Sequence, residues 1–600
     1  MKKFFKYVLA TVVGVVLVNF VFTIIFFAGL AGMAGSFSTG PAAPEIRERT
    51  VLELTLDQPV VDRASENPLD SFDPFTLSAN PPLGLNALLK KIRTAATDDR
   101  VAGIYLNLDD VHADYGALAT IDELRAALGE FKEGGKFVYA YSALGYSQKA
   151  YYLAVVADSL FMNPEASLLL TGMSATVSYY KELLEKVGVQ PEVVRVGKFK
   201  SAVEPFLESR MSEANREQLS TYLNSRWRNV AGGISAGRGI PVERLDRLVN
   251  DFQIYTAGEL AREKLIDAVA WDDEMEWKLK AAAGVEEGDE LNMVALEDYS
   301  KFSLPDKEAR GKKIAVIYAQ GEIGMEQGAY AIGPGLAATI REAREDSAVK
   351  AIVLRVNSPG GSASTSDIIW REVALAAGVK PVVASMGNVA ASGGYYIACA
   401  AHAIVAEPTT LTGSIGVFGL FFSGEKLIRD QIGIRSEVVK THEYSDFGGS
   451  YPLPMLPVSS RALSPHERAV LQSHVNKTYD TFLDRVSRGR GMTREAVHEV
   501  GQGRVWTGED ARRLGLVDTL GGLDDAIRLA AETAGLTAYE LKELPAPVPF
   551  WQSLLKSFPA AVKARVVRAE LGEFYPVYEQ QKRLLNARGV LARLPYDLSL

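Results

Sequence analysis

The stretch GNVAASGGYYIA, residues 387–398, places Ser392 between two alanines and two glycines. Small neighbours on both sides allow another stretch of backbone to approach this serine closely. A serine hydroxyl is a weak nucleophile until a base removes its proton and hydrogen-bond donors stabilise the oxyanion that forms. A serine that leads into a helix can also cap the helix N-terminus, which is the competing interpretation of Ser392. The motif therefore predicts a nucleophile only if a base and oxyanion donors are found elsewhere.

The glycine turn NSPGGSAS, residues 357–364, is a source of oxyanion donors. It follows a run that predicts a strand and precedes a run that predicts a helix. Gly360 and Gly361 can adopt backbone conformations closed to other residues, so their amides can face a ligand, and the helix N-terminus adds positive potential. A tight strand-to-helix turn without a catalytic role is the alternative interpretation.

Composition argues against several other kinds of chemistry. The formal net charge of −9 gives no basic footprint for nucleic acid. Cys399 is the only cysteine, so an intrachain disulfide and a cysteine-based metal site are both excluded. The histidines show no HExxH or paired-ligand spacing, and none lies in a motif that would make it the base for Ser392. We therefore expect neither a metal nor a cofactor. The six histidines are His112, His402, His442, His466, His474 and His498.

The elements that must position these residues occur in two copies along the chain, as an internal repeat. Shared words such as YYxA, LTG and EVV recur in the same order, which makes duplication a better explanation than chance. Three pairs of segments resemble each other: 98–110 and 346–358, 136–172 and 380–413, and 188–206 and 433–452.

Each copy alternates short apolar, β-branched runs with helical stretches. Continuous apolar strands separated by helices are typical of βαβ units and mainly parallel sheets, so we predict the α/β class. In the second copy the pattern predicts a helix over 335–346 and strands over 313–320, 351–357, 381–386 and 403–408. The predicted organisation is a first repeat over 46–298, a linker over 299–312, a second repeat over 313–540 and a helical tail over 541–600.

The N-terminus predicts a membrane anchor within residues 1–45. Lys2, Lys3 and Lys6 precede the apolar run 7–30, which is long enough to cross the hydrocarbon core. The lysines place the N-terminus in the cytoplasm and the rest of the chain outside it. A cleavable signal peptide, whose apolar region is shorter at about 7–15 residues, is the alternative. We expect an uncleaved single-pass anchor that contacts membrane lipid.

Three words in the second copy, VNSPGGSASTSD, GNVAASGGYYIACAA and EPTTLTGSIGVFG, resemble the signal peptide peptidase A family, serine peptidase family S49. The duplication and the anchor are similar to the long form of that family, and the resemblance is weakest over 541–600. It implies the fold of Clp protease and crotonase, as two tandem repeats of a ββα superhelix. It also implies a Ser/Lys dyad in which Ser392 is the nucleophile and Lys200 is the general base. Lys200 lies in FKSAVEPF, where the family has a YKSAVEPF-like motif.

The resemblance also implies supporting residues. The oxyanion donors would be the amides of Gly361 and Gly393, with Gly360 beside them in the glycine turn. Ser414, in LTGSIG, would hydrogen-bond the lysine amine and orient it. A serine that only structures its own loop is the alternative interpretation of Ser414.

The alignment of the two copies agrees with a dyad divided between them. Position 392 corresponds to Gln148 in the first copy, and position 200 corresponds to Ser445 in the second. Each copy therefore holds one half of the predicted dyad, and the base for Ser392 comes from the other repeat.

A lysine base requires a lowered pKa. The ordinary lysine pKa of about 10.4 must fall toward neutrality before the amine can accept a proton at physiological pH. Desolvation in an apolar interface lowers it, and the positive charges of Lys198 and Arg195 would add to that effect. A surface lysine at an exposed strand end is the alternative interpretation of Lys200.

The resemblance implies remnant signal peptides and other short apolar peptides as substrates, and a homotetramer. It places the enzyme in the bacterial inner membrane with its catalytic part on the periplasmic, extracytoplasmic side. Two rival functions fit parts of the sequence, namely a crotonase-like acyl-CoA enzyme and an inactive membrane scaffold. Neither of these functions requires contact between Ser392 and Lys200, so the distance between the two side chains distinguishes them from the peptidase.

Overall fold

The computed structural model describes most of the chain beyond the N-terminal region. The predicted anchor over 7–30 and residues 301–310 of the predicted linker lie outside the described residues, as does most of the tail. Within the described ranges, no helix is both long enough and apolar enough to cross a membrane. The described residues are 44–65, 72–73, 78–79, 81–111, 118–252, 255–300, 311–324, 331–449, 458–546 and 590–593.

The first half is built on a six-stranded parallel sheet in the order β12-β8-β7-β6-β1-β13. Its strands are short apolar runs, as expected for a sheet covered by helices. The strands are β1 (Thr50–Leu54), β6 (Val101–Asn107), β7 (Phe137–Ser142), β8 (Ser159–Met162), β12 (Ala268–Val269) and β13 (Met293–Ala295). The helices are α2 (Leu85–Ala96), α3 (Leu118–Glu133), α4 (Gln148–Ala154), α7 (Glu213–Arg238), α8 (Val242–Asn250), α9 (Ala257–Arg262) and α10 (Asp272–Ala283).

The second half repeats this sheet in the order β24-β20-β19-β17-β14-β25, again with parallel neighbours. The strands are β14 (Lys313–Gln320), β17 (Val349–Ser358), β19 (Val382–Ala391), β20 (Ala403–Ala406), β24 (Thr519–Leu520) and β25 (Glu540–Leu544), with β21 (Leu411–Gly413) and β23 (Val505–Thr507) joined to β19. The helices are α11 (Gly335–Glu345), α12 (Ala363–Ala377), α13 (Gly393–Ala398), α14 (Pro465–Arg490), α15 (Arg494–Val500), α16 (Gly508–Arg513) and α17 (Leu523–Thr533).

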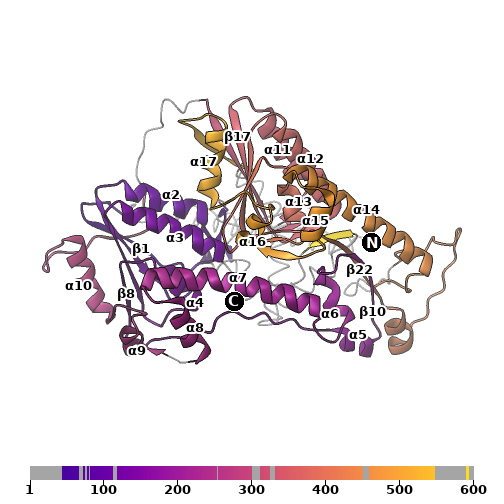
Figure 1. Cartoon of the computed structure of the whole chain (residues 1–600), viewed down its shortest axis with the longest axis horizontal. Coiled ribbons are helices and arrows are strands. Elements are labelled where there is room, and N and C mark those ends of the chain that lie inside the picture. Colours follow the sequence, from indigo (N-terminus) through magenta and orange to yellow (C-terminus); the bar gives the residue numbers. More distant parts are fainter. Residues whose placement is uncertain are drawn as a thin grey trace, which may run out of the picture.

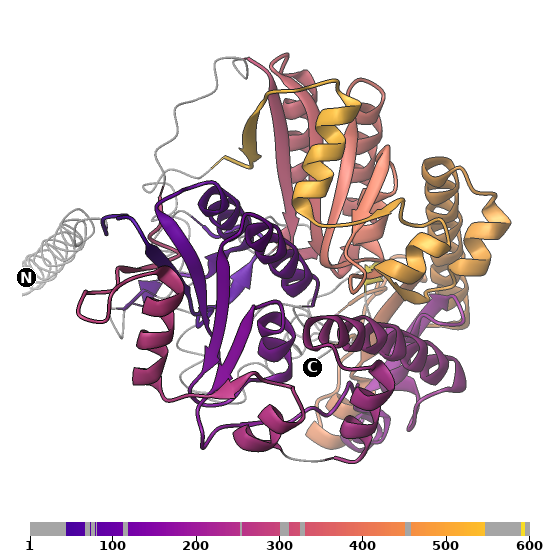
Figure 2. The ribbon, with the colours of Figure 1, turned by 60° about the vertical axis from the view of Figure 1, so that its left-hand side comes forward.

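The two halves therefore share one order of strands and one order of helices, each with its own apolar core. The long helices α7 and α14 occupy the same place in the two orders, and each has 26 residues. Figure 2 shows the two main sheets as separate units, and Figure 1 shows α7 extending under both halves. The predicted α/β class is confirmed, and the predicted strand 313–320 has the same bounds as β14.

A third sheet joins the halves. In it β10 (Gln190–Val196) of the first half pairs antiparallel with β22 (Val417–Ser423) of the second half. The order is β10-β22-β26-β18-β15-β16, where β15 is Glu322–Ile323, β16 is Ala331–Ile332, β18 is Gly360–Ser362 and β26 is Val590–Arg593. The chain that leaves β10 is thereby brought against the second half. The remaining short elements are β2 (Val60–Val61), β3 (Phe72–Asp73), β4 (Ser78–Ala79), β5 (Leu83–Gly84), β9 (Ser167–Leu168), β11 (Tyr255–Thr256), α5 (Lys181–Val187) and α6 (Glu204–Leu207), with a 3-10 turn at Ser201–Val203 and a π-helical turn at Leu427–Ile432.

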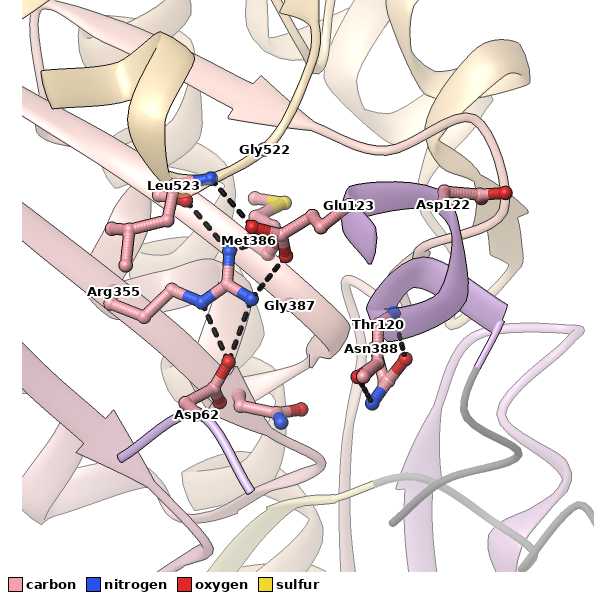
Figure 3. Close-up of polar contacts among 12 residues, drawn as sticks. Asp62, Thr120, Asp122, Glu123, Arg355, Met386, Gly387, Asn388, Gly522 and Leu523 are labelled. Atoms are coloured by element: carbon pink, nitrogen blue, oxygen red, sulfur yellow. Dashed lines mark hydrogen bonds and ion pairs between the residues drawn. The ribbon is translucent and has the colours of Figure 1, made fainter. Parts of the chain in front are cut away.

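A buried ionic cluster fixes the two halves to each other (Figure 3). Arg355 of β17 is 1% exposed, and its guanidinium donates to Asp62 Oδ1 at 2.8 Å and to Glu123 Oε1 at 2.5 Å, both in the first half. Glu123 Oε2 also accepts from the backbone amide of Leu523 at 2.8 Å. Burial by itself lowers the pKa of Arg355, but the two carboxylates outweigh it and hold that pKa above its ordinary value.

Candidate active site

Ser392 stands between β19 and α13 in a strained backbone conformation. It has φ 56° and ψ −114°, and it is completely buried. A residue with a side chain rarely adopts positive φ, and such a conformation costs about 1–3 kcal/mol, which the surrounding structure must offset. The Ser392 side chain makes no capping hydrogen bond to α13. In the first half, by contrast, the Ser147 hydroxyl accepts from the Ala150 amide at the start of α4. The geometry therefore speaks against the capping interpretation of Ser392.

Lys200 lies just after β10 and reaches Ser392 from the other half of the chain. Its Nζ is 2.8 Å from Ser392 Oγ, across a sequence separation of 192 residues. The same Nζ is 3.0 Å from Ser414 Oγ and 3.2 Å from the Ser414 carbonyl oxygen. The lysine side chain is completely buried, so the interpretation as a surface lysine is wrong. The structure brings Ser392, Lys200 and Ser414 into one hydrogen-bonded cluster.

Burial lowers the pKa of Lys200 well below its ordinary value. An ammonium removed from water loses its hydration, and here no carboxylate restores the charged form. Lys198 and Arg195 are exposed at the surface and do not contribute to the lowering. The expectation that their charge assists is corrected: desolvation is the cause. Burial therefore favours the neutral amine of Lys200 over its ammonium form.

Two glycines of the second half, which sequence reasoning did not single out, make room for Lys200. A Cβ on Gly503, whose φ is +81°, would lie 2.6 Å from both the nitrogen and the Cβ of Lys200. A Cβ on Gly416 would lie 3.2 Å from Lys200 Cδ. The neighbouring Gln502 carbonyl accepts from the Phe199 amide at 2.9 Å. The sequence does show a pair of glycines in GQGRVW, residues 501–506, but nothing in it links these glycines to Lys200.

The glycine turn packs its backbone directly against the start of α13. Gly360 and Gly361 have φ values of 95° and 153°, and a Cβ on Gly361 would lie 1.9 Å from the Ile323 carbonyl oxygen. A Cβ on Gly393 would lie 3.1 Å from the Gly361 nitrogen, so these two predicted oxyanion donors are neighbours. The Gly393 amide begins α13, where helix geometry provides no intrahelical acceptor. Gly393 directly follows Ser392 and packs against the Gly361 backbone, and a side chain added at either glycine would meet neighbouring atoms.

An extended strand passes beside this turn. The backbone of β26 pairs antiparallel with β18, with Ala592 opposite Gly361. The same strand pairs with β22 on its other side, with Leu591 opposite Phe418. The space between β18 and β22, which borders the Ser392 cluster, therefore accommodates one extended segment of polypeptide.

Comparison with known sequences first gives the class of protein. The sequence profile of peptidase family S49 matches residues 130–286 and 374–537, one match in each half. This is a serine peptidase, and therefore a hydrolase. The chain belongs to peptidase family S49, which confirms the resemblance that the three motifs carried.

Three relatives agree with this placement over most of their length. The chloroplastic serine protease SPPA of Arabidopsis thaliana is 36% identical over 502 residues, 82% of this chain and 70% of that protein. Protease 4 of Salmonella typhi is 38% identical over 493 residues, 80% of this chain and 77% of its own. Protease 4 of Haemophilus influenzae is 36% identical over 458 residues, which are 74% of this chain and 71% of that protein.

Proposed function

We propose that this peptidase uses Ser392 as nucleophile and Lys200 as general base to cleave remnant signal peptides and other short apolar peptides. The observation that carries the proposal is the 2.8 Å contact between Lys200 Nζ and Ser392 Oγ. Both side chains are completely buried, and the pKa of the lysine is lowered by that burial. A base must lie within hydrogen-bond reach of the proton that it abstracts, and this pair meets the requirement.

The reaction is acyl transfer in two stages. Neutral Lys200 accepts the hydroxyl proton while Ser392 Oγ forms a bond to the peptide carbonyl carbon. The amides of Gly361 and Gly393 donate to the oxyanion, and the new ammonium gives its proton to the amine as the C–N bond breaks. Lys200 then accepts a proton from a water molecule as the water oxygen bonds to the acyl carbon. The ester C–O bond to Ser392 breaks, the acid product leaves, and the Lys200 ammonium returns the proton to Ser392 Oγ. Ser414 Oγ and its carbonyl accept from the amine throughout and keep its lone pair aimed at Ser392.

An extended peptide is the substrate form that suits this site. β26 pairs antiparallel with β18 on one side and with β22 on the other, so both of these strands offer a backbone edge to an extended segment. A peptide substrate would use the same main-chain hydrogen bonds, with Gly361 on one side of it and Phe418 on the other. Main-chain binding of this kind tolerates many side chains, as a degrader of varied peptides requires.

The membrane location follows from the anchor predicted over residues 7–30 and from the resemblance to signal peptide peptidase A. A single-pass anchor with the catalytic halves outside the cytoplasm would hold the site near the bilayer, where signal-peptide remnants remain. In a bacterium with two membranes this is the periplasmic side of the inner membrane. The resemblance to the family also implies that the chain forms a homotetramer.

The proposal is tested with the full chain in detergent and an internally quenched synthetic signal peptide. Ser392→Ala is expected to reduce kcat by a factor on the order of 10⁴ or more, as loss of a nucleophile does in other serine peptidases. Ser147→Ala is the matched control, because Ser147 precedes the equivalent helix of the first half. Its loss costs about 1 kcal/mol of stability and leaves cleavage intact.

The same preparation separates the rival functions. Turnover of an acyl-CoA that survives Ser392→Ala would favour the crotonase-like enzyme. A folded wild-type protein that cleaves neither peptide nor ester would favour the scaffold. Either result would contradict the proposed dyad.

A further inference from the structure

Lys200 stands at the centre of a tight turn of the backbone. Its φ of −76° and ψ of 75° are those of the middle residue of an inverse γ-turn. The hydrogen bond that closes such a turn is present, because the Ser201 amide donates to the Phe199 carbonyl oxygen at 2.8 Å. The turn fixes the point from which the lysine side chain, a flexible stem of four carbons, extends toward Ser392. A shift of the turn would therefore move Nζ away from Ser392 Oγ.

One side chain of α7 holds both ends of this turn. Gln218 is 1% exposed, and its Nε2 lies 3.0 Å from the Phe199 carbonyl oxygen and 2.7 Å from Ser201 Oγ. Asn215 lies on the same face of α7, and its Oδ1 is 2.9 Å from Ser201 Oγ and 3.0 Å from Gln218 Nε2. The two amide protons of Gln218 and the hydroxyl proton of Ser201 therefore meet three acceptor oxygens, so all three protons can be used in hydrogen bonds.

The other end of the Gln218 amide reaches the second half of the chain. Its Oε1 accepts from the Val505 amide at 3.4 Å, at the start of β23. This strand begins two residues after Gly503, the glycine that packs against the Lys200 backbone. Gln218 therefore connects the lysine turn and the Gly503 loop to one helix, α7, which extends under both halves (Figure 1).

A buried amide at this position needs a reason beyond packing. Glutamine and asparagine are mostly exposed in proteins, and burial of an amide without hydrogen bonds is costly. An aliphatic residue would fill the space between α7 and the lysine turn without that cost. What glutamine adds is a donor for the Phe199 carbonyl oxygen and for the hydroxyl of Ser201, on either side of Lys200.

The second half offers an internal comparison. Helices α7 and α14 each begin after a capping serine and each have 26 residues. When the two capping serines are aligned, Gln218 corresponds to Val470, which is 54% exposed. In this second copy Ser445 takes the place of Lys200. The buried amide thus accompanies the lysine, and the copy without the lysine has an exposed valine instead.

We propose that Gln218 is a positioning residue for the base, acting with Asn215 and Ser201 through the turn that carries Lys200. Its hydrogen bonds go to groups beside the lysine rather than to Nζ or to Ser392 Oγ. It therefore acts on where Nζ lies and on how completely the amine is shielded from water. The inference rests on the proposed dyad, because Gln218 has this role only if Lys200 is the base.

Loss of the amide should loosen the turn with two measurable consequences. Displacement of Nζ slows proton transfer and lowers kcat, whereas KM, which reflects peptide binding at the strand edges, changes little. Burial lowers the pKa of Lys200, so water that enters beside a loosened turn moves that pKa back toward its ordinary value. A loss of stability alone would change neither the kcat of the folded protein nor its pH dependence.

The test uses the full chain in detergent, a short apolar peptide ester and Gln218→Met, which keeps the length of the side chain and removes its hydrogen bonds. This variant is expected to lose about 10–100-fold in kcat with KM within about twofold, and the acid limb of its kcat/KM profile should lie at higher pH than in the wild type. Ser225→Ala is the matched control, because Ser225 is buried two turns further along α7 and its Oγ lies 2.9 Å from Thr507 Oγ1 of β23. It should lower the unfolding temperature but keep the wild-type kcat and acid limb.

Ser201→Ala keeps the proposal testable if Gln218→Met does not fold, since it removes a single oxygen atom from the group. It should move the acid limb in the same direction and lose about 2–10-fold in kcat, the equivalent of one hydrogen bond. The double variant should fall no more than about twofold below Gln218→Met, because both substitutions break the same contacts.

The outcomes separate the role of Gln218 from the dyad itself. Wild-type kcat and an unmoved acid limb in folded Gln218→Met, or in Ser201→Ala where Gln218→Met does not fold, would overturn the proposal. Equal losses of kcat in Gln218→Met and Ser225→Ala would also overturn it, by showing a general effect of α7. Lys200→Ala in the same series tests the dyad: full activity in that variant would remove the dyad, whereas an inactive Lys200→Ala beside a fully active Gln218→Met would remove only the role of Gln218.

Discussion

Gly503→Ala is expected to inactivate the enzyme by moving Lys200 while leaving its side chain chemically intact. The added Cβ would lie 2.6 Å from the nitrogen and Cβ of Lys200. Ordinary contacts between carbon atoms are about 3.5–4.0 Å, so the two backbones must separate by about 1 Å. The atoms that clash belong to the lysine backbone and Cβ and cannot rotate away.

The size of the effect follows from this displacement. A misplacement of about 1 Å in a catalytic constellation costs on the order of 10² in rate, because the 2.8 Å contact with Ser392 is lost. A left-handed conformation adds a stability cost of about 1–2 kcal/mol for any residue with a Cβ. Gly491→Ala isolates that second cost, since Gly491 has φ +63° and its added Cβ meets no atom within 4 Å.

The assay compares kcat/KM for a short apolar peptide ester, together with thermal unfolding, for the wild type and both variants. Gly503→Ala should lose about 100-fold in kcat/KM, whereas Gly491→Ala should lose stability only. If Gly503→Ala hydrolyses the ester at the wild-type rate while folded, the tight fit around Lys200 is unimportant for catalysis and the reasoning fails.

Four further predictions concern the pH dependence of activity, the stability of a Lys200 variant, the ionic cluster and the tail. The proposed dyad requires neutral Lys200, so it predicts that kcat/KM rises with pH through a limb well below the ordinary lysine pKa. A limb near pH ~10.4 would contradict this. The pKa of Lys200 is lower in the folded chain than in the unfolded chain, so between these two pKa values the unfolded chain binds the additional proton and wild-type stability rises with pH. Lys200→Met should therefore be more stable than the wild type at neutral pH, and the difference in unfolding free energy should shrink as the pH approaches ~10.4. Arg355→Met leaves two buried carboxylates unpaired and should cost about 3–5 kcal/mol in denaturant unfolding, against about 1 kcal/mol or less for exposed Arg341→Met. Deletion of residues 590–600 should lower KM for peptides by freeing β18 and β22, and an unchanged KM would show that β26 does not compete with substrate.

The sequence was most informative where a function depends on a local word. The glycine turn and the residues around Ser392 form contiguous motifs, and the apolar runs between them predicted β14 and its neighbours closely. The resemblance to family S49 implied that the proposed base and nucleophile come from different halves, and the internal repetition agreed with that prediction. These features are local or periodic, so they can be read without knowledge of the packing.

Contacts between distant segments could not be read in the same way. Gly503 is constrained by Lys200 only after the chain folds, and the sequence shows it as one more loop glycine. Arg355 is the one charged residue of the predicted strand 351–357, and its partners Asp62 and Glu123 lie in the other half. The strain at Ser392 is a property of backbone geometry that no residue type specifies. The residue types of the candidate site could be predicted from the sequence, but the packing around them could not.

The most direct test of the divided dyad is hydrolysis of a short apolar peptide ester by the full chain and by Lys200→Ala. Lys198→Ala is the matched control, two residues away and exposed. The dyad predicts that Lys200→Ala loses about 10²–10⁴-fold in kcat while it remains folded, the range for loss of a general base. Lys198→Ala should stay within about twofold of wild type, since most surface substitutions change free energies by about 0.5 kcal/mol or less. Near-wild-type hydrolysis by folded Lys200→Ala would mean that Ser392 takes its base from elsewhere.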